Sequence, residues 1–168
     1  ARPLDGARTS VRAGECAASQ GRAAREGGGV AVRAEAPGGA YEPNKSRFSG
    51  LTGIPTLIGW QNHERQWRGA TYSQVTDYRL ENGVRRDRAS DVQDLYTTQD
   101  WARAWEVIDR YGIDYIVVGG AERTMIRQLA GDDAGRQREY EQGLAKFEQV
   151  LTPVCEFGSA AVYRVRPG

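Results

Sequence analysis

The chain has 168 residues, with 23 lysines and arginines against 22 aspartates and glutamates, and a formal net charge of +1 at pH 7. This length suits one ordinary domain, and the balanced charge argues against a nucleic-acid-binding protein, which carries a clear basic excess. No stretch approaches the roughly 20 apolar residues that a helix needs to span a bilayer. The two cysteines, Cys16 and Cys155, are too few for a disulfide scaffold, and Cys155 is predicted as a small apolar residue in a strand.

The first part of the chain differs in texture from the rest. Residues 1–40 contain no aromatic side chain, are dominated by Ala, Gly and Arg, and show no sustained period of 2 or 3.6. Such a segment cannot bury enough apolar surface to offset the entropy lost on ordering. We expect residues 1–29 to be a disordered leader, or the product of a wrong upstream reading frame, and residues 30–168 to form a single α/β domain that starts with a short edge strand at 30–35.

The next segments carry weaker signals. Residues 51–59 are apolar but contain Pro55, which cannot donate to a sheet ladder, so they are predicted as a short edge strand or an extended loop. Residues 61–69 are polar and aromatic. Residues 71–96 are strongly charged, with weak helical character at 89–96.

A helix is clearly indicated after this charged region. Thr98 is predicted as its N-cap, with Trp101 at the third helical position. Trp101, Trp105 and Ile108 recur at spacings of four and three, which places them on one face that we expect to be buried. Gly112 suits a left-handed residue at the helix end.

A buried strand is expected directly afterwards. Residues 114–118 are apolar almost throughout, as in a strand covered on both faces. Gly119-Gly120 then predicts a tight strand-to-helix turn, because the three-glycine fingerprint of a nucleotide site is missing. Residues 121–130 are predicted as the helix that follows.

The C-terminal part predicts one helix and a hairpin. The apolar stripe of the helix comprises Tyr140, Leu144, Phe147, Val150 and Leu151. Pro153 stops this helix, and strands at 153–157 and 160–165 join through Gly158-Ser159. The order of elements predicts an α/β fold with a Rossmann-like layered sheet, mostly parallel with a C-terminal antiparallel hairpin, and with helices on both faces.

The densest group of chemically active side chains lies at residues 60–69. The candidate binding residues are Trp60, His63, Glu64, Gln66, Trp67 and Arg68. His63 beside Glu64 suggests an acid–base pair, Arg68 an anion site, and the two indoles a surface for a sugar ring. A functional stretch should converge on one open concavity. Alternatively the tryptophans belong to the core, His63 is a hydrogen-bonded strut and the arginines pair with local acids.

Other chemistries find little support in the sequence. The residues after His63-Glu64 do not repeat the histidine at zinc-protease spacing, and no Cys-x-x-Cys pair exists. No Gly-x-Ser-x-Gly nucleophile elbow is present either. We therefore predict neither a metal nor a cofactor, and no complete active site within this chain.

Several motifs resemble the C-terminal part of the YYY (Chlor_Arch_YYY) family of large multi-spanning membrane proteins. The most specific match comprises residues 51–56 (LTGIPT), Gly59-Trp60, His63-Glu64 and 66–69 (QWRG). Looser matches are 91–97 (DVQDLYT), 111–119 (YGIDYIVVG), 143–147 (GLAKF) and 161–165 (AVYRV). The resemblance covers about residues 37–166, and residues 1–29 do not match the helix and strand that the family usually shows upstream.

The resemblance implies a setting for the domain. The family is uncharacterised in function, and its membrane part resembles lipid-linked-sugar glycosyltransferases of the GT-C type. Such enzymes, like oligosaccharyltransferases, often end in an extracytoplasmic α/β domain with a "kYgv-Yvvvg" strand and a closing "vY+v" strand, and both are present here. The catalytic carboxylates would then lie in a membrane part outside this chain.

Three hypotheses follow from the resemblance and the motifs. The chain is an accessory or acceptor-binding domain of a glycosyltransferase-like membrane protein, a structural or interaction domain of a membrane protein without a glycan role, or a free-standing hydrolase built on His63 and Glu64. The partners implied by the first are the transmembrane portion of the same parent protein and a glycan or polyprenyl-phosphate sugar, with no nucleic acid.

Overall fold

A computed structural model describes residues 31–39, 42, 45–46, 49 and 53–166 of the chain. The predictions for residues 1–29 lie outside the described residues. None of the helices in the described part is long and apolar enough to cross a membrane.

The main sheet has four strands in the order β1-β4-β6-β5. They are β1 (Val32–Ala34), β4 (Ile113–Val118), β5 (Pro153–Phe157) and β6 (Ala160–Arg164). β1 runs parallel to β4, whereas β6 runs antiparallel to both β4 and β5. The α/β class and the C-terminal hairpin are thus confirmed, but the sheet is mixed and not mostly parallel. The reason is that β6 returns through the tight hairpin turn and enters the sheet between β5 and β4.

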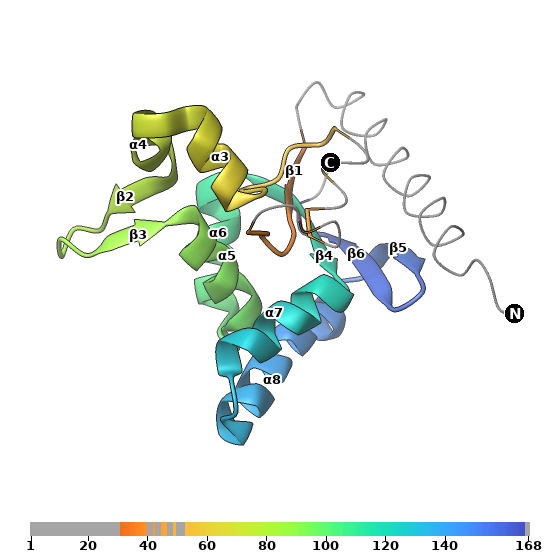
Figure 1. The fold of residues 1–168 in the computed structure, drawn as a ribbon. Coiled ribbons are helices and arrows are strands. Elements are labelled where there is room, and N and C mark those ends of the chain that lie inside the picture. The colour runs from red at the N-terminus through yellow and green to blue at the C-terminus, as the bar shows by residue number, and fades with distance from the viewer. Residues whose placement is uncertain (1–30, 40–41, 43–44, 47–48, 50–52, 167–168) are drawn as a thin grey trace, which may run out of the picture.

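The helices that cover this sheet lie on one face. They are α5 (Arg88–Thr97), α6 (Trp101–Tyr111), α7 (Gly120–Ala130) and α8 (Ala134–Val150), seen together in Figure 1. Their apolar sides pack with Ile116, Val118 and Tyr163 of the sheet in one large core. Tyr115 and Val117 point the other way, into a smaller second cluster. Within the described residues, helices therefore cover one face, and the prediction of helices on both faces is not confirmed.

Helix α6 begins two residues later than a Thr98 cap would allow. Its N-cap is Asp100, whose carboxylate accepts a hydrogen bond from the Ala102 amide at 2.8 Å. The Thr98 hydroxyl instead accepts from the Asp100 amide at 3.1 Å and shapes the preceding turn. Gly112 ends the helix in the left-handed conformation, as predicted.

The buried face of α6 differs from the predicted one at Trp105. The fully buried residues are Ala104, Val107 and Ile108, with Trp101 partly buried beside them, while Trp105 is 40% exposed. The buried stripe comprises positions 101, 104 and 108, whereas the predicted stripe comprised 101, 105 and 108. Both have helical spacing, and both contain Trp101 and Ile108. The spacing alone did not distinguish them.

Trp105→Ala is therefore expected to lower the free energy of unfolding by less than about 1 kcal/mol, because surface substitutions remove little packing. Ile108→Ala in the same helix should cost about 2–5 kcal/mol, since it leaves a core cavity. Urea denaturation of both variants measures the difference. Equal costs would mean that the indole of Trp105 is buried after all.

The turn from β4 into α7 is held by a buried acid. Gly119 is the N-cap of α7, and a Cβ there would lie 3.0 Å from the Ala160 Cβ. The Glu122 carboxylate accepts hydrogen bonds from the amides of Gly119 and Ala36, both at 2.8 Å. Burial raises the pKa of Glu122 to about 7 against the opposing effect of these bonds. The predicted strand-to-helix turn at Gly119-Gly120 is confirmed.

Helices α5 and α8 meet through their backbones. A Cβ on Gly143 of α8 would lie 2.1 Å from the carbonyl oxygen of Thr97 at the end of α5. One turn further, the buried Lys146 ammonium donates to the carbonyl oxygens of Leu95 at 2.6 Å and Gly143 at 2.8 Å. The neighbouring Phe147 is fully buried, as predicted from the apolar stripe of this helix.

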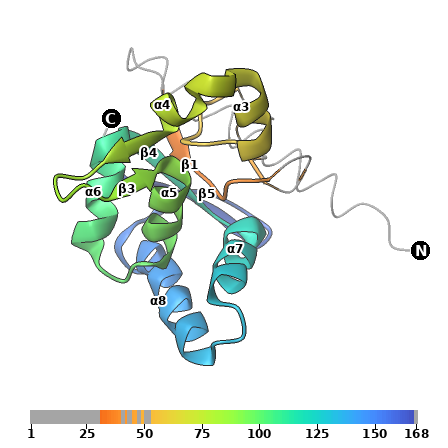
Figure 2. The same ribbon diagram turned by 60° about the vertical axis from the view of Figure 1, so that its left-hand side comes forward.

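Residues 61–87 form an arm that stands outside these layers (Figures 1 and 2). It consists of α3 (Gln61–Arg68), the 3-10 turn η1 (Gly69–Thr71), α4 (Tyr72–Thr76) and the hairpin β2 (Asp77–Arg79) and β3 (Arg85–Asp87). The arm follows an extended segment that pairs with β1 through an isolated bridge from Thr56 to Arg33 and forms no strand among its described residues, so the loop alternative for 51–59 is correct for those residues. The weak helix signal at 89–96 is confirmed by α5, whereas the hairpin was not predicted.

Candidate functional site

Trp60 anchors the start of α3. It is the N-cap residue, and its indole N–H donates to the carbonyl oxygens of Glu42 and Lys45, both at 3.2 Å. Gly38 makes room for the ring, because a Cβ there would lie 2.5 Å from Trp60 Cδ1. The Gly38 amide also donates to the Gly59 carbonyl at 3.2 Å. Trp60 therefore links Gly38, Glu42 and Lys45 to the start of the arm.

Glu64 fixes the same helix end from the other side. One carboxylate oxygen accepts from the Gly59 amide at 2.8 Å, and the other lies 3.4 Å from Arg68 Nε, one helical turn away. Neighbouring residues on a helix do not face each other, so Glu64 and His63 project in different directions. The carboxylate is engaged in holding the backbone and its next turn.

His63 lies between two indole rings. It is only 8% exposed. Its ring centroid is 5.3 Å from that of Trp60 in an edge-to-face arrangement, and 5.6 Å from that of Trp67 with the planes 15° apart. Trp67 itself is 82% exposed. One side of the outer indole is therefore supported by the imidazole, and the other side is open.

Polar and cationic groups accompany the exposed indole. Gln66 and Arg68 are exposed on the same helix, and the Arg65 guanidinium lies 5.2 Å from the centre of the Tyr72 ring. The pair of Arg68 with Glu64 is solvent-exposed and adds little stability. The guanidinium of Arg68 is thus free to turn toward a ligand. We call Arg65, Gln66, Trp67 and Arg68 the α3 platform.

The structure separates the six candidate residues into two groups. Trp60, His63 and Glu64 hold α3 in place, while Gln66, Trp67 and Arg68 are exposed. The exposed group projects from one short helix, and the other group makes contacts beneath it. The arrangement is a supported surface with an aromatic centre.

A second polar cluster, absent from the sequence analysis, joins the arm to the body. Asp91 of α5 is 1% exposed and accepts hydrogen bonds from the hydroxyls of Tyr78 (2.7 Å) and Tyr111 (2.6 Å) and from the Arg86 guanidinium (3.0 Å). Burial raises the pKa of both tyrosines, and the hydrogen bond to Asp91 raises it further. Arg86 also pairs with Asp94. Because all these groups satisfy one another, we interpret the cluster as the attachment of the arm.

The described residues contain no group of three or more histidines, cysteines, aspartates or glutamates placed to hold a metal ion. Cys155 lies in β5, as predicted, but it is disulfide-bonded and is not a free apolar thiol. The other cysteine of the chain, Cys16, lies outside the described residues.

Comparison with known proteins gives limited guidance. No family model matches the chain, and no curated protein matches it, so membership of the YYY family stays a prediction. A solved structure of similar fold is the C-terminal globular domain of an oligosaccharyltransferase from Archaeoglobus fulgidus. The two are 12% identical, the match covers 81% of this chain and 84% of that one, and the TM-score is 0.46. At this TM-score the likeness carries no argument about function.

Proposed function

We propose that this chain is an accessory, acceptor-binding domain of a glycosyltransferase-like membrane protein, and that the α3 platform binds a carbohydrate. The observation that carries the proposal is the Trp67 indole, 82% exposed and stacked on the buried imidazole of His63. A large aromatic ring that is exposed to solvent suits a partner with a flat apolar face.

The chemistry of the platform matches a sugar. The C–H face of a pyranose ring is apolar and flat, so it can cover the open side of the indole, while its hydroxyls need donors and acceptors at the rim. Gln66 supplies an amide, and Arg68 supplies a guanidinium for hydroxyl, phosphate or carboxylate oxygens. The contact with the His63 ring restricts the Trp67 side chain before binding, so binding loses less side-chain entropy.

The accessory role rests on what His63 and Glu64 do. His63 is buried between two rings, and the Glu64 carboxylate is bonded to Gly59 and Arg68. These positions favour support of the helix over proton transfer to a substrate. The geometry therefore gives no support to a free-standing hydrolase, and the catalytic carboxylates of the proposed enzyme belong to another part of the protein.

The disulfide supports an extracytoplasmic setting. Cys155 is disulfide-bonded, and disulfides persist in oxidising compartments outside the cytosol. The proposed partner on that side is the transmembrane portion of the same parent protein, with a glycan or a polyprenyl-phosphate sugar as ligand.

The test is binding by Trp67→Ala. We expect the wild-type domain to bind on a glycan array, and calorimetry with the best glycan to show at least a tenfold weaker affinity for the variant. The melting temperature should stay nearly unchanged, because the ring is exposed. Trp105→Ala is the matched control, since it removes another exposed indole from α6 and should leave affinity intact.

Two outcomes would contradict the proposal. One is a wild-type domain that binds no glycan, and the other is an equal affinity of the wild type and Trp67→Ala. Either would favour the alternative of a structural or interaction domain of a membrane protein. Arg68→Ala tested in the intact membrane protein extends the experiment, and we expect lost activity with an unchanged melting temperature of the domain.

A further inference from the structure

The β2–β3 hairpin sorts its charges onto two faces. In its antiparallel register Asp77 lies opposite Asp87, Tyr78 opposite Arg86, and Arg79 opposite Arg85. Tyr78 and Arg86 point to Asp91, which fixes one face against the body. Since side chains alternate along a strand, the other four residues share the opposite face.

Three of those four charges are engaged within the protein. Asp87 is the N-cap of α5 and accepts from the Ser90 amide at 2.7 Å. Asp77 accepts from Arg85 Nε at 2.8 Å, and this contact lowers the pKa of its carboxyl group. Arg79 donates to the Gly83 carbonyl at 3.3 Å and has no carboxylate partner in the described part of the chain.

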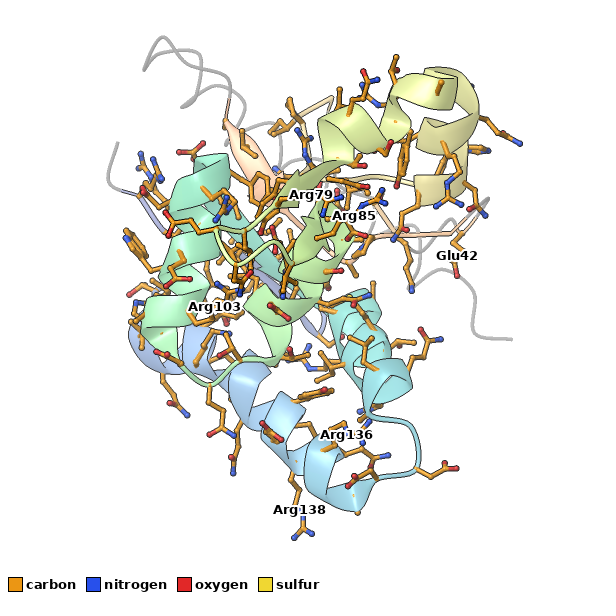
Figure 3. All side chains as sticks on the ribbon, turned by 90° about the vertical axis from the view of Figure 1, so that its left-hand side faces the viewer. Glu42, Arg79, Arg85, Arg103, Arg136 and Arg138 are labelled. Carbon is orange, nitrogen blue, oxygen red and sulfur yellow. The ribbon has the colours of Figure 1, made fainter. Side chains whose placement is uncertain are left out.

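The register places two guanidinium groups directly opposite each other. Like charges at opposed positions of an antiparallel pair are destabilising. The pairing of Asp77 with Arg85 compensates only one of the two charges. Because Asp77 pairs with Arg85 and Asp87 caps α5, Arg79 is left as the charge on this face without a partner of opposite sign in the described part of the chain. Figure 3 labels Arg79 and Arg85 near each other.

A hollow lies over these two arginines. Its volume is about 320 Å³, and it is lined by Ser73, Gln74, Asp77, Tyr78, Arg79 and Arg85. The Ser73 hydroxyl and the Gln74 amide add hydrogen-bond donors from α4 to the guanidinium groups from the hairpin. The Asp77 carboxylate faces the same hollow, but Arg85 and the Thr76 hydroxyl already engage it.

We propose that this hollow is a binding site for a phosphate ester, in which Arg79 is the principal ligand and Arg85, Ser73 and Gln74 complete the set of donors. The planar fork of an arginine matches two oxygens of one phosphate. The volume lies at the lower end of the roughly 300–1,000 Å³ of ligand pockets, which suits a phosphate with part of the group that carries it. The site is separate from the α3 platform and does not depend on carbohydrate binding there.

The test compares two substitutions that remove the same charge. Phenyl phosphate, added at constant ionic strength, should raise the melting temperature of the wild type, because a ligand that binds only the folded state stabilises it. We expect Arg79→Gln to weaken phenyl phosphate binding at least tenfold, measured by calorimetry. Arg138→Gln should bind as the wild type does, since Arg138 lies far away on α8 (Figure 3). An equal response in all three proteins would overturn the proposal.

A second arm of the experiment identifies the source of the phosphate. Vesicles of phosphatidylcholine, with and without phosphatidic acid, are sedimented with each protein. Sedimentation that needs both phosphatidic acid and Arg79 assigns a lipid headgroup, whereas binding of phenyl phosphate without sedimentation assigns a phosphorylated soluble molecule. Binding of neither probe refutes the site. Trp67→Ala should bind phenyl phosphate normally, so the two proposals fail independently.

Discussion

Asp91→Ala is expected to lower the free energy of unfolding by about 3–5 kcal/mol. The side chain is almost completely buried and is the common acceptor for Tyr78, Tyr111 and Arg86. Its removal leaves two hydroxyls without their acceptor and a half-buried guanidinium without its inner partner. The arm should then detach from α5 before the core unfolds, because these bonds join the hairpin to the body.

Urea denaturation followed by circular dichroism measures the loss. The control is Asp94→Ala, which also removes a partner of Arg86 from α5, but from a side chain that is 36% exposed. An exposed ion pair contributes about 0–1 kcal/mol, so this variant should stay close to the wild type. If both variants lost the same small amount, the Asp91 cluster would not be what holds the arm.

The second large effect concerns pH. Burial lowers the pKa of Lys146 from its ordinary value of 10.5 to about 7 in the folded protein. Between pH 7 and about 9.5 the unfolded chain therefore holds one proton more than the folded one, and stability rises with pH. We expect the free energy of unfolding to increase by about 3 kcal/mol across this window.

The contribution is isolated by comparison with Lys146→Met, which keeps a side chain of similar length without an amine. The difference in unfolding free energy between wild type and Lys146→Met should change with pH across this window, whereas Lys45→Met, at the only other lysine of the chain, should follow the wild type. A pH-independent difference between wild type and Lys146→Met would show that the buried ammonium keeps its proton, stabilised by the carbonyls of Leu95 and Gly143.

The elements that sequence patterns predicted are those whose signals are local. The run at 114–118 is apolar almost throughout, Gly112 ends its helix in the left-handed conformation, and Gly158-Ser159 joins two short strands. The Asn82-Gly83 pair is likewise a strong hairpin signal. The flanking strands, Asp-Tyr-Arg and Arg-Arg-Asp, lack the alternating apolar residues that normally accompany such a turn, and the hairpin was not predicted. Their stability comes from charge pairs and from Asp91.

The candidate site was predictable in composition but not in arrangement. The sequence places aromatic and cationic residues together because they belong to one short helix. Which of them are exposed depends on Gly38 and on two carbonyl groups of the preceding loop, which capture Trp60. Trp105 shows the same limit, since a residue at the edge of an apolar stripe is buried or exposed according to the neighbours that the fold supplies.

The contact at Gly143 also determines the position of α8 along the axis of α5. A shift by one helical turn would bring either Glu139 or Phe147 against the Thr97 carbonyl, and neither side chain fits where even a single carbon does not. The absence of a side chain thus acts as a notch that sets the axial register of the helix pair. Leucine-like side chains along α8 would hold the helices together at several offsets, whereas the notch admits one.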